Sequence, residues 1–320
     1  MSKIYNLQLF AELNTQTTAT GTLSPEMKVF YSDYLIDNAV PKLVHDQFGQ
    51  KHPIPKNGGK TIEFRKYSPL PKLLTPLTEG VTPDGQSLTV TTIEATVAQY
   101  GGYVTLSDML LMTAIDNNMV QATKLLGNQA GATLDTITRE VLNGGTNVVY
   151  AGGVASRSAL GDNKLTVDDI KKAVRALKNQ NAEKIGDSFV AIIHPDVTYD
   201  LTNDPTWQAV KDYDPKDWYE GEIGKIAGVR FVETTEAKIF EGGVYSTLIL
   251  GENAYGVTEI EGGGLQHIVK QLGSAGSADP LDQRSSVGWK ALKTAELLIP
   301  NYLVRVESCS KRFSSTAQAN

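Results

Sequence analysis

The sequence has almost no cysteine. Cys309 is the only one among 320 residues, so the chain cannot form a disulfide within itself, and it has too few thiols for a cysteine-based metal site. Long apolar runs are also missing, since no segment approaches the roughly 18 residues that a membrane-spanning helix needs. The first ten residues have neither a sustained apolar stretch nor a small-residue cleavage site, which disfavours a secretory signal. These absences predict a soluble protein that folds in the cytoplasm without a membrane anchor.

An excess of positive charge is also lacking. The formal net charge is -6 and the sequence pI is about 5.4. Proteins that grip nucleic acid rely on clustered Lys and Arg side chains that displace counterions from the phosphates. The charge therefore disfavours a nucleic-acid reader, but it is compatible with a wall that encloses a polyanion without binding to it.

Local motifs for catalysis or cofactor binding are missing as well. Residues 59–61 resemble the end of a phosphate-binding loop, but Ile54 stands where the first glycine belongs. Residues 212–217 resemble a calcium loop, but Ile223 stands where its closing glutamate belongs. The four histidines lack the spacing of a zinc site, and Cys309 has no evident base beside it. A turn, a solvated loop or a packed side chain explains each feature better.

Residues 1–58 are predicted to form an extended arm with one short helix. Ser24 and Pro25 are suited to a helix start, so we expect a helix over about 25–39. Closer to the N-terminus, the apolar side chains of Leu7, Leu9 and Phe10 are candidates for contact with another subunit. The alternative is an arm that packs on its own subunit.

Residues 60–98 carry a β pattern. Strands are expected at 61–65, where apolar and polar residues alternate, and at 88–97, which is rich in Thr, Val and Ile. The connection between Tyr67 and Ser87 is far longer than a normal hairpin turn, and loops of this length in compact domains are usually functional. We expect it to project from the body and contact a neighbouring subunit. Its candidate contact residues are the four prolines Pro69, Pro71, Pro76 and Pro83.

Helices are predicted next. Ser107 and Asp108 open a helical region that breaks around 116–118 and resumes as one long helix to about Leu142, because apolar residues recur at three- and four-residue steps. A second helix begins at Thr166 with a capping-box pattern.

The remaining sequence predicts a mixed body. Residues 189–193 form an apolar run typical of a buried strand, and the acidic, aromatic segment 196–222 is predicted to be a helix followed by an exposed loop. Further strands are expected at 229–234, 245–250, 266–271, 286–291 and 302–306.

The order of these parts resembles the major capsid proteins of tailed bacteriophages, which share the α+β Hong Kong 97-like fold. The opening Tyr5-Asn6-Leu7-Gln8-Leu9-Phe10-Ala11-Glu12 and the stretch 279–290 resemble the podophage N-four-type major capsid protein family. The resemblance implies an N-terminal arm at 1–58, an extended β loop at 59–99 and a peripheral domain with a long spine helix at 100–159. It further implies an axial domain at 160–262 and a return to the peripheral domain at 263–320.

The resemblance implies a structural protein and no enzyme, cofactor or metal. Hexameric and pentameric capsomers of this chain would close into an icosahedral shell around double-stranded DNA, without sequence-specific binding, and the shell would be part of the virion after assembly in the host cytoplasm. The arm lacks the long helical, charged segment that serves some relatives as a built-in scaffold, so a separate scaffolding protein is implied, together with a portal.

Two alternatives remain open at this point. One is an encapsulin-type nanocompartment shell protein, which would share the fold but enclose an enzyme. The other is a soluble α/β enzyme with a site in the acidic region 196–222.

Overall fold

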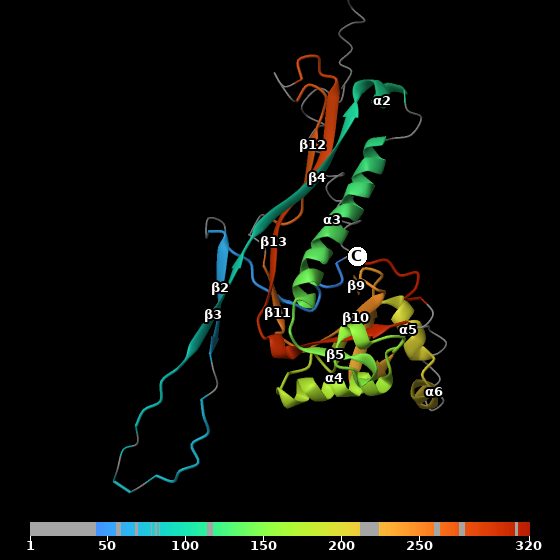
Figure 1. Cartoon of the computed structure of the whole chain (residues 1–320). Coiled ribbons are helices and arrows are strands. Elements are labelled where there is room, and N and C mark those ends of the chain that lie inside the picture. The colour runs from blue at the N-terminus through green and yellow to red at the C-terminus, as the bar shows by residue number, and fades with distance from the viewer. Residues whose placement is uncertain are drawn as a thin grey trace, which may run out of the picture. The chain divides into compact units, whose positions relative to one another are not determined.

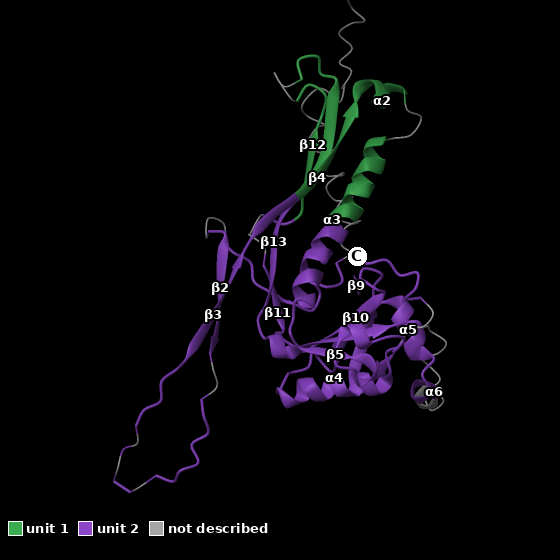
Figure 2. Cartoon of the chain, viewed as in Figure 1, with its two compact units in different colours: residues 1–41, 101–130, 265–290 green, residues 42–100, 131–264, 291–320 purple. Residues whose placement is uncertain are grey.

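The computed structural model describes residues 43–55, 59–67, 70–77, 79–80, 82, 84–113, 118–211, 224–258, 263–274, 279–310 and 313–320. The helix expected over 25–39 lies outside the described residues. Two compact units divide the chain (Figure 2). Unit 1 contains residues 1–41, 101–130 and 265–290, and unit 2 contains residues 42–100, 131–264 and 291–320. Within the described ranges, no helix combines the length and apolarity that crossing a membrane would require.

The core of unit 2 is a seven-stranded mixed sheet in the order β5-β14-β10-β6-β8-β7, with β9 paired to β10. All residues of β6, β10 and β14 are buried, which is typical of strands covered on both faces. The strands predicted at 189–193, 229–234, 245–250 and 302–306 are confirmed. The members are β5 (Val148–Tyr150), β6 (Phe189–Ile193), β7 (Lys225–Ile226), β8 (Val229–Glu233), β9 (Ile239–Phe240), β10 (Val244–Leu250) and β14 (Leu303–Cys309).

Helix α4 (Val167–Asn179) packs on this sheet at β14. The Thr166 hydroxyl accepts a hydrogen bond from the Asp169 backbone N–H at 3.4 Å, which confirms the predicted cap. Its apolar face is buried. The four residues of that face are Val167, Ile170, Val174 and Leu177.

Two helices occupy the described part of the acidic segment 196–222. They are α5 (Pro195–Thr202) and α6 (Pro205–Lys211). One helix was expected there. Asp204 accepts a hydrogen bond from the Thr206 N–H at 2.8 Å, and Pro205 is favoured at the first position of a helix, so the chain ends one helix and starts another. Short 3-10 helices lie at Ala151–Gly153, Arg157–Ala159 and Pro300–Tyr302.

A second sheet has members in both units. In unit 2, β1 (Gln50–Lys51) pairs in parallel with β11 (Tyr255–Thr258), which pairs antiparallel with the C-terminal part of β13 (Arg284–Leu297). In unit 1, β12 (Gln266–Lys270) pairs antiparallel with the N-terminal part of β13. Strand β4 (Ala98–Ser107) also pairs with β13, and no strand was predicted over most of its length.

The long helix is confirmed as α3 (Asn118–Asn143), preceded by the short helix α2 (Asp108–Thr113) (Figure 1). The predicted stop after Leu142 is also confirmed, because Gly144 donates hydrogen bonds to the carbonyls of Glu140 and Val141 and the helix goes no further. In unit 2, Leu142 is fully buried in a cluster that includes Ile192 and Leu248 of the seven-stranded sheet.

The two strands predicted around the long loop are confirmed as β2 (Thr61–Tyr67) and β3 (Val90–Thr96). They form a two-stranded antiparallel sheet of their own. Residues 59–61 are therefore a turn that enters a strand, as the failed phosphate-loop pattern indicated.

Candidate assembly surfaces

The β2–β3 hairpin carries the long loop that the sequence predicts to be an assembly element. Its register runs from Thr61↔Thr96 to Tyr67↔Val90, so both strands end at the same level. Figure 1 shows the loop between them extending away from the two strands. The described part of the loop therefore makes little contact with the rest of unit 2.

The structure describes only part of the predicted contact residues. Pro71 and Pro76 are exposed, on a stretch without helix or strand. Outside the described residues are Leu7, Leu9, Phe10, Pro69 and Pro83. A role in assembly stays a prediction for all of them.

The leucines between these prolines were not among the predicted contact residues. Leu70, Leu73, Leu74 and Leu77 are 52%, 77%, 86% and 75% exposed. Single exposed apolar residues are normal, but a contiguous group of this kind marks an interaction site. The prolines were the visible signal in the sequence, whereas the leucines carry the apolar area. We call residues 70–77 the leucine segment.

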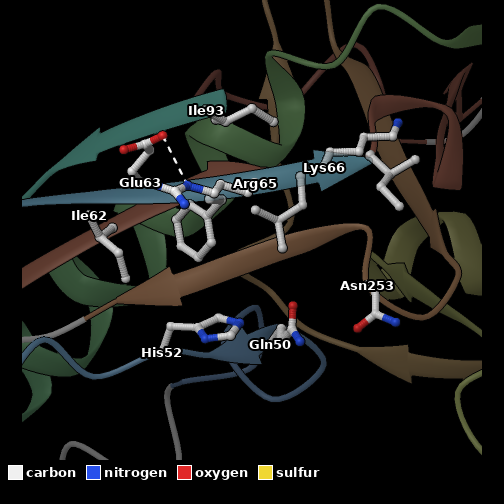
Figure 3. A pocket seen from close by; sticks show the side chains of 11 residues that line it. Gln50, His52, Ile62, Glu63, Arg65, Lys66, Ile93 and Asn253 are labelled. Carbon is white, nitrogen blue, oxygen red and sulfur yellow. Dashed lines mark hydrogen bonds and ion pairs between the residues drawn. The ribbon is translucent and has the colours of Figure 1, made fainter. Parts of the chain in front are cut away.

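A cavity of about 400 Å³ lies beside the strands of the hairpin, within unit 2 (Figure 3). Its apolar walls are Ile62, Phe64 and Ile93 from the hairpin, with Leu298 and Ile299 from the residues after β13. We call it the hairpin cavity. Its apolar wall residues are all half-buried, so the chain itself leaves them partly uncovered.

One side of the hairpin cavity is aromatic. The Phe64 ring stands edge-on to the His52 imidazole, with ring centroids 5.3 Å apart. A Cβ atom on Gly256 would come within 3.3 Å of the Phe64 ring. Glycine at this position therefore lets the ring lie against the backbone of β11, which fixes the hairpin to the body of unit 2.

The rim of the hairpin cavity is polar and mostly cationic. The Arg65 Nε donates to the Glu63 Oε1 at 3.4 Å, and both side chains are exposed. Lys66 lies beside them, and Gln50 and Asn253 line the opposite side. Exposed pairs of this kind contribute little to stability, about 0–1 kcal/mol, so these charges remain available to a partner.

A buried polar cluster fastens the residues that follow the arm. The His45 backbone N–H and Nδ1 lie 2.7 and 2.6 Å from the two carboxylate oxygens of Asp135, and both side chains are fully buried. Asp46 accepts hydrogen bonds from the Thr138 hydroxyl at 2.5 Å and from the Lys293 ammonium. Since breaking a buried pair costs about 3–5 kcal/mol, the chain is firmly held on α3 from His45 onward.

A second buried cluster joins the end of α3 to the seven-stranded sheet. The fully buried Glu307 accepts hydrogen bonds from the Arg157 Nε and Nη2 at 2.6 and 2.7 Å and from the Arg305 Nε at 2.9 Å. These hydrogen bonds raise the pKa of Arg157. Arg305 also donates to the Asn143 carbonyl at the end of α3. The Arg157 guanidinium stacks 3.7 Å from the centroid of the Phe240 ring.

Unit 1 exposes a further group of apolar side chains, which sequence analysis also missed. None of the six described residues of α2 is buried, and Met109, Leu110 and Met112 are exposed on it. Tyr103 of β4 and Leu281 are exposed as well. The run from Met109 to Met112 was visible in the sequence directly after the predicted helix start.

Side chains that could support catalysis are used here for packing and capping. His194 Nδ1 accepts a hydrogen bond from the Asp196 N–H at 3.1 Å and so caps α5, and burial lowers the pKa of His194. The Tyr245 hydroxyl donates to Asp196 at 2.7 Å, and burial with this contact raises the pKa of Tyr245. Burial likewise raises the pKa of the Cys309 thiol. Among the described residues, no three His, Cys, Asp or Glu side chains are grouped as metal ligands.

Comparisons with known proteins agree with an assembly role. A family model described as phage capsid protein matches residues 90–293. No curated protein sequence matches the chain. Among solved structures, the chain is similar to the capsid of cyanophage Pam1, with a TM-score of 0.67 and 15% identity over 86% of this chain and 92% of that one.

Two further phage capsids are similar. The capsid of cyanophage P-SCSP1u has a TM-score of 0.63 and 14% identity over 84% of this chain and 88% of that one. The capsid of Ralstonia phage GP4 has a TM-score of 0.63 and 15% identity over 83% of this chain and 88% of that one. At these identities the likeness shows the fold, which is the α+β Hong Kong 97-like fold that the sequence predicts.

The family model covers more than half of the 320 residues, from the start of β3 into the C-terminal part of β13. The chain therefore belongs to the phage capsid protein family.

Proposed function

We propose that many copies of this chain close into the icosahedral head shell of a tailed phage and enclose its double-stranded DNA. The observation that carries this proposal is the capsid family match over 90–293, which makes the chain a capsid shell protein. A structural family of this kind indicates a non-enzymatic role.

Shell assembly requires contacts between different surfaces of identical copies. Such heterologous contacts form a ring when the rotation between copies closes, which is how hexameric and pentameric capsomers would arise. The leucine segment and the exposed apolar residues of α2 support this proposal, because both present apolar side chains that the described residues leave exposed. Each contact can be weak, since every copy is held by several neighbours at once.

The net charge of -6 supports a wall that encloses DNA without sequence-specific binding. We also expect a separate scaffolding protein and a portal as partners, assembly in the host cytoplasm and a final place in the virion. The division into arm, extended loop, peripheral domain and axial domain belongs to this proposal as well, with the boundaries given by the family resemblance.

Two alternatives are less well supported. A virus-like particle from Pyrococcus furiosus is similar in fold, with a TM-score of 0.54 and 12% identity, so fold alone does not separate phage shells from other shells. The family match is to a phage capsid protein, which does not favour an encapsulin. A soluble enzyme is disfavoured by the same match, and two of the described acidic side chains of 196–211 have structural roles, since Asp204 caps α6 and Asp196 accepts from the Tyr245 hydroxyl.

Sedimentation and electron microscopy of the purified protein, with and without a coexpressed scaffolding protein, test the proposal. We expect capsomers or closed shells whose formation depends on ionic strength, because exposed charges line the candidate contacts. Shells isolated from infected cells should protect DNA from nuclease. A monomer at every concentration and salt, with and without scaffold, would contradict the proposal, and shells that enclose an enzyme in place of DNA would favour the encapsulin alternative.

A further inference from the structure

The leucine segment has a period of three in its sequence. Positions 70, 73 and 76 are Leu, Leu and Pro, and positions 71, 74 and 77 are Pro, Leu and Leu. Positions 72 and 75 are Lys and Thr. A polyproline II helix has three residues per turn, so each series would form one edge of it. In that conformation two of the three edges are apolar and the third is polar.

The prolines favour this conformation before any partner is present. Proline fixes its own φ near −65° and biases the preceding residue toward extended conformations, which here affects Leu70 and Thr75. The structure assigns no helix or strand to residues 70–77, with one bend at Thr75. Because the two prolines limit the conformations of the free segment, it loses less conformational entropy when it binds, so it is suited to act as a ligand.

The described residues of the copy do not cover the leucines of the segment. All four are exposed, and the segment leaves β2 after Tyr67 and extends away from the strands that line the hairpin cavity (Figure 1). None of residues 70–77 lines the hairpin cavity of its own copy.

The hairpin cavity has the properties that such a ligand needs. Polyproline segments bind in grooves with aromatic walls, and the Phe64–His52 pair supplies one here. The volume of about 400 Å³ lies within the range of about 300–1,000 Å³ that is usual for ligand pockets. Figure 3 shows Ile62 and Ile93 at the same cavity, from opposite strands of the hairpin.

The charges of the two partners are complementary. Arg65 and Lys66 on the rim are exposed cations. Beyond the leucines, the loop continues with the exposed acids Glu79 and Asp84. The single cation of the segment, Lys72, lies on the polar edge, which faces solvent when the two apolar edges are bound.

We propose that the leucine segment of one copy binds in the hairpin cavity of a neighbouring copy, as a polyproline-like strand with its two apolar edges buried. This inference rests on the proposed function, because it needs a second copy. The contact joins two different surfaces, so a copy that inserts its segment into one neighbour still presents its own cavity to another. Such a contact repeats around a ring.

Disulfide trapping between separately purified variants tests the pairing. One variant carries Leu74→Cys and the other carries Ile93→Cys, so a cross-link between the two new cysteines must join two copies. Because disulfides form only when the Cα atoms approach within about 7 Å, the bond reports direct contact. The single natural thiol, Cys309, is buried and contributes little background.

We expect at least tenfold more cross-linked dimer in mixed shells than in a matched mixture of Lys72→Cys with Ile93→Cys, because position 72 faces away. Shells that form normally but give equal or no cross-linking in the two mixtures would overturn this inference and leave the proposed function intact. If the parent chain forms no shells or capsomers under any condition, the proposed function fails first and the inference fails with it.

A photocrosslinking side chain at position 93 tests the identity of the occupant. Mass spectrometry of irradiated shells should find it attached to residues 70–77. Attachment to residues 1–42 of the arm, or to a scaffolding protein, would overturn the inference. A pair of double variants provides a further test if the cysteine variants do not assemble. Leu73→Ser with Leu74→Ser should lower the shell yield at least tenfold and leave the melting temperature unchanged, whereas Lys72→Ser with Thr75→Ser should leave both unchanged. Equal shell yields for the two double variants would overturn the inference.

Discussion

Strand β10 and the leucine segment are both rich in large apolar residues, yet they differ completely in exposure. All residues of Val244–Leu250 are buried between β14 and β6. All described residues from Leu70 to Leu77 are exposed. The difference follows from the neighbours that each segment has in one chain. Apolar residues in the sheet stabilise the subunit, whereas those in the loop have no comparable partner until a second copy arrives.

The energetic consequence is a separation of folding from assembly. Burying a leucine side chain contributes about 1.5–3 kcal/mol, so burying a few exposed leucines at a contact between subunits would stabilise the assembled state. Damage to the sheet should therefore unfold the subunit, and damage to the loop should leave the subunit folded but unable to assemble. The predictions below test this separation through the stability of the unassembled subunit.

The largest loss of stability is expected from Glu307→Gln. The substitution leaves Arg157 and Arg305 without their buried carboxylate, and breaking a buried pair costs about 3–5 kcal/mol. The matched control is Glu63→Gln, which breaks an exposed pair and should cost at most about 1 kcal/mol. Urea unfolding of the unassembled subunit measures both. Equal losses would show that the buried carboxylate of Glu307 does not stabilise the subunit more than an exposed one.

The next largest loss is expected from Leu248→Ala in the middle of β10. Leu248 is buried in a cluster with Ile192 and Leu142, and a cavity at such a site costs about 2–5 kcal/mol. The same substitution at Leu74 removes only exposed atoms and should change the unfolding free energy by less than about 0.5 kcal/mol. Equal destabilisation by the two substitutions would break the comparison between sheet and loop.

Most of the fold was predictable because its signals are local. The cap at Thr166, the glycines after Asn143 and the alternation in β2 each act within a few residues. Strand β4 was not predicted, and it contains the adjacent glycines Gly101 and Gly102, which are uncommon inside strands. A Cβ on Gly101 would come within 2.7 Å of the Trp289 carbonyl oxygen, so the glycine permits a close approach to the paired strand β13 and marks no turn.

The candidate surfaces were less predictable because they depend on distant residues. His45 is hydrogen-bonded to Asp135, 90 positions away in sequence, and Arg157 to Glu307, 150 positions away. No local sequence pattern predicts such pairs. The hairpin cavity likewise combines strands β2 and β3 with residues after β13. The loop itself was predictable from its length and prolines. The apolar character of its surface comes from the leucines between the prolines, which were not among the predicted contact residues.

A smaller effect is expected from acid. Burial lowers the pKa of His194 and outweighs the opposite influence of Asp196 and Glu233. The unfolded chain therefore binds a proton at a higher pH than the folded chain does. The stability contributed by neutral His194 is present above about pH 6.5 and is lost as the pH falls through and below that value.

His194→Asn keeps an acceptor for the cap of α5 but cannot titrate. Between pH 7.5 and 5.5, where most carboxylates stay ionised, the parent subunit should lose more unfolding free energy than this variant. Some loss should remain, because burial also lowers the pKa of His267. Urea unfolding at a series of pH values measures the difference. Identical pH profiles would show that His194 does not contribute.

The smallest effect on the subunit, and the most informative for the comparison, is expected when residues 68–89, which join the paired Tyr67 and Val90, are replaced by Asn-Gly. Strands β2 and β3 should still pair, because this dipeptide is suited to a tight hairpin turn. The core lies in the seven-stranded sheet, α4 and the buried end of α3, so the unfolding free energy should change by less than about 0.5 kcal/mol.

Shells should nevertheless fail to close, because the leucine segment is gone while the hairpin and its cavity remain. Circular dichroism melts and electron micrographs of the variant and the parent measure the two effects separately. Normal shells would show that the loop is not an assembly element. Loss of cooperative melting would show that the loop belongs to the core of the subunit, and the separation of folding from assembly would then be wrong.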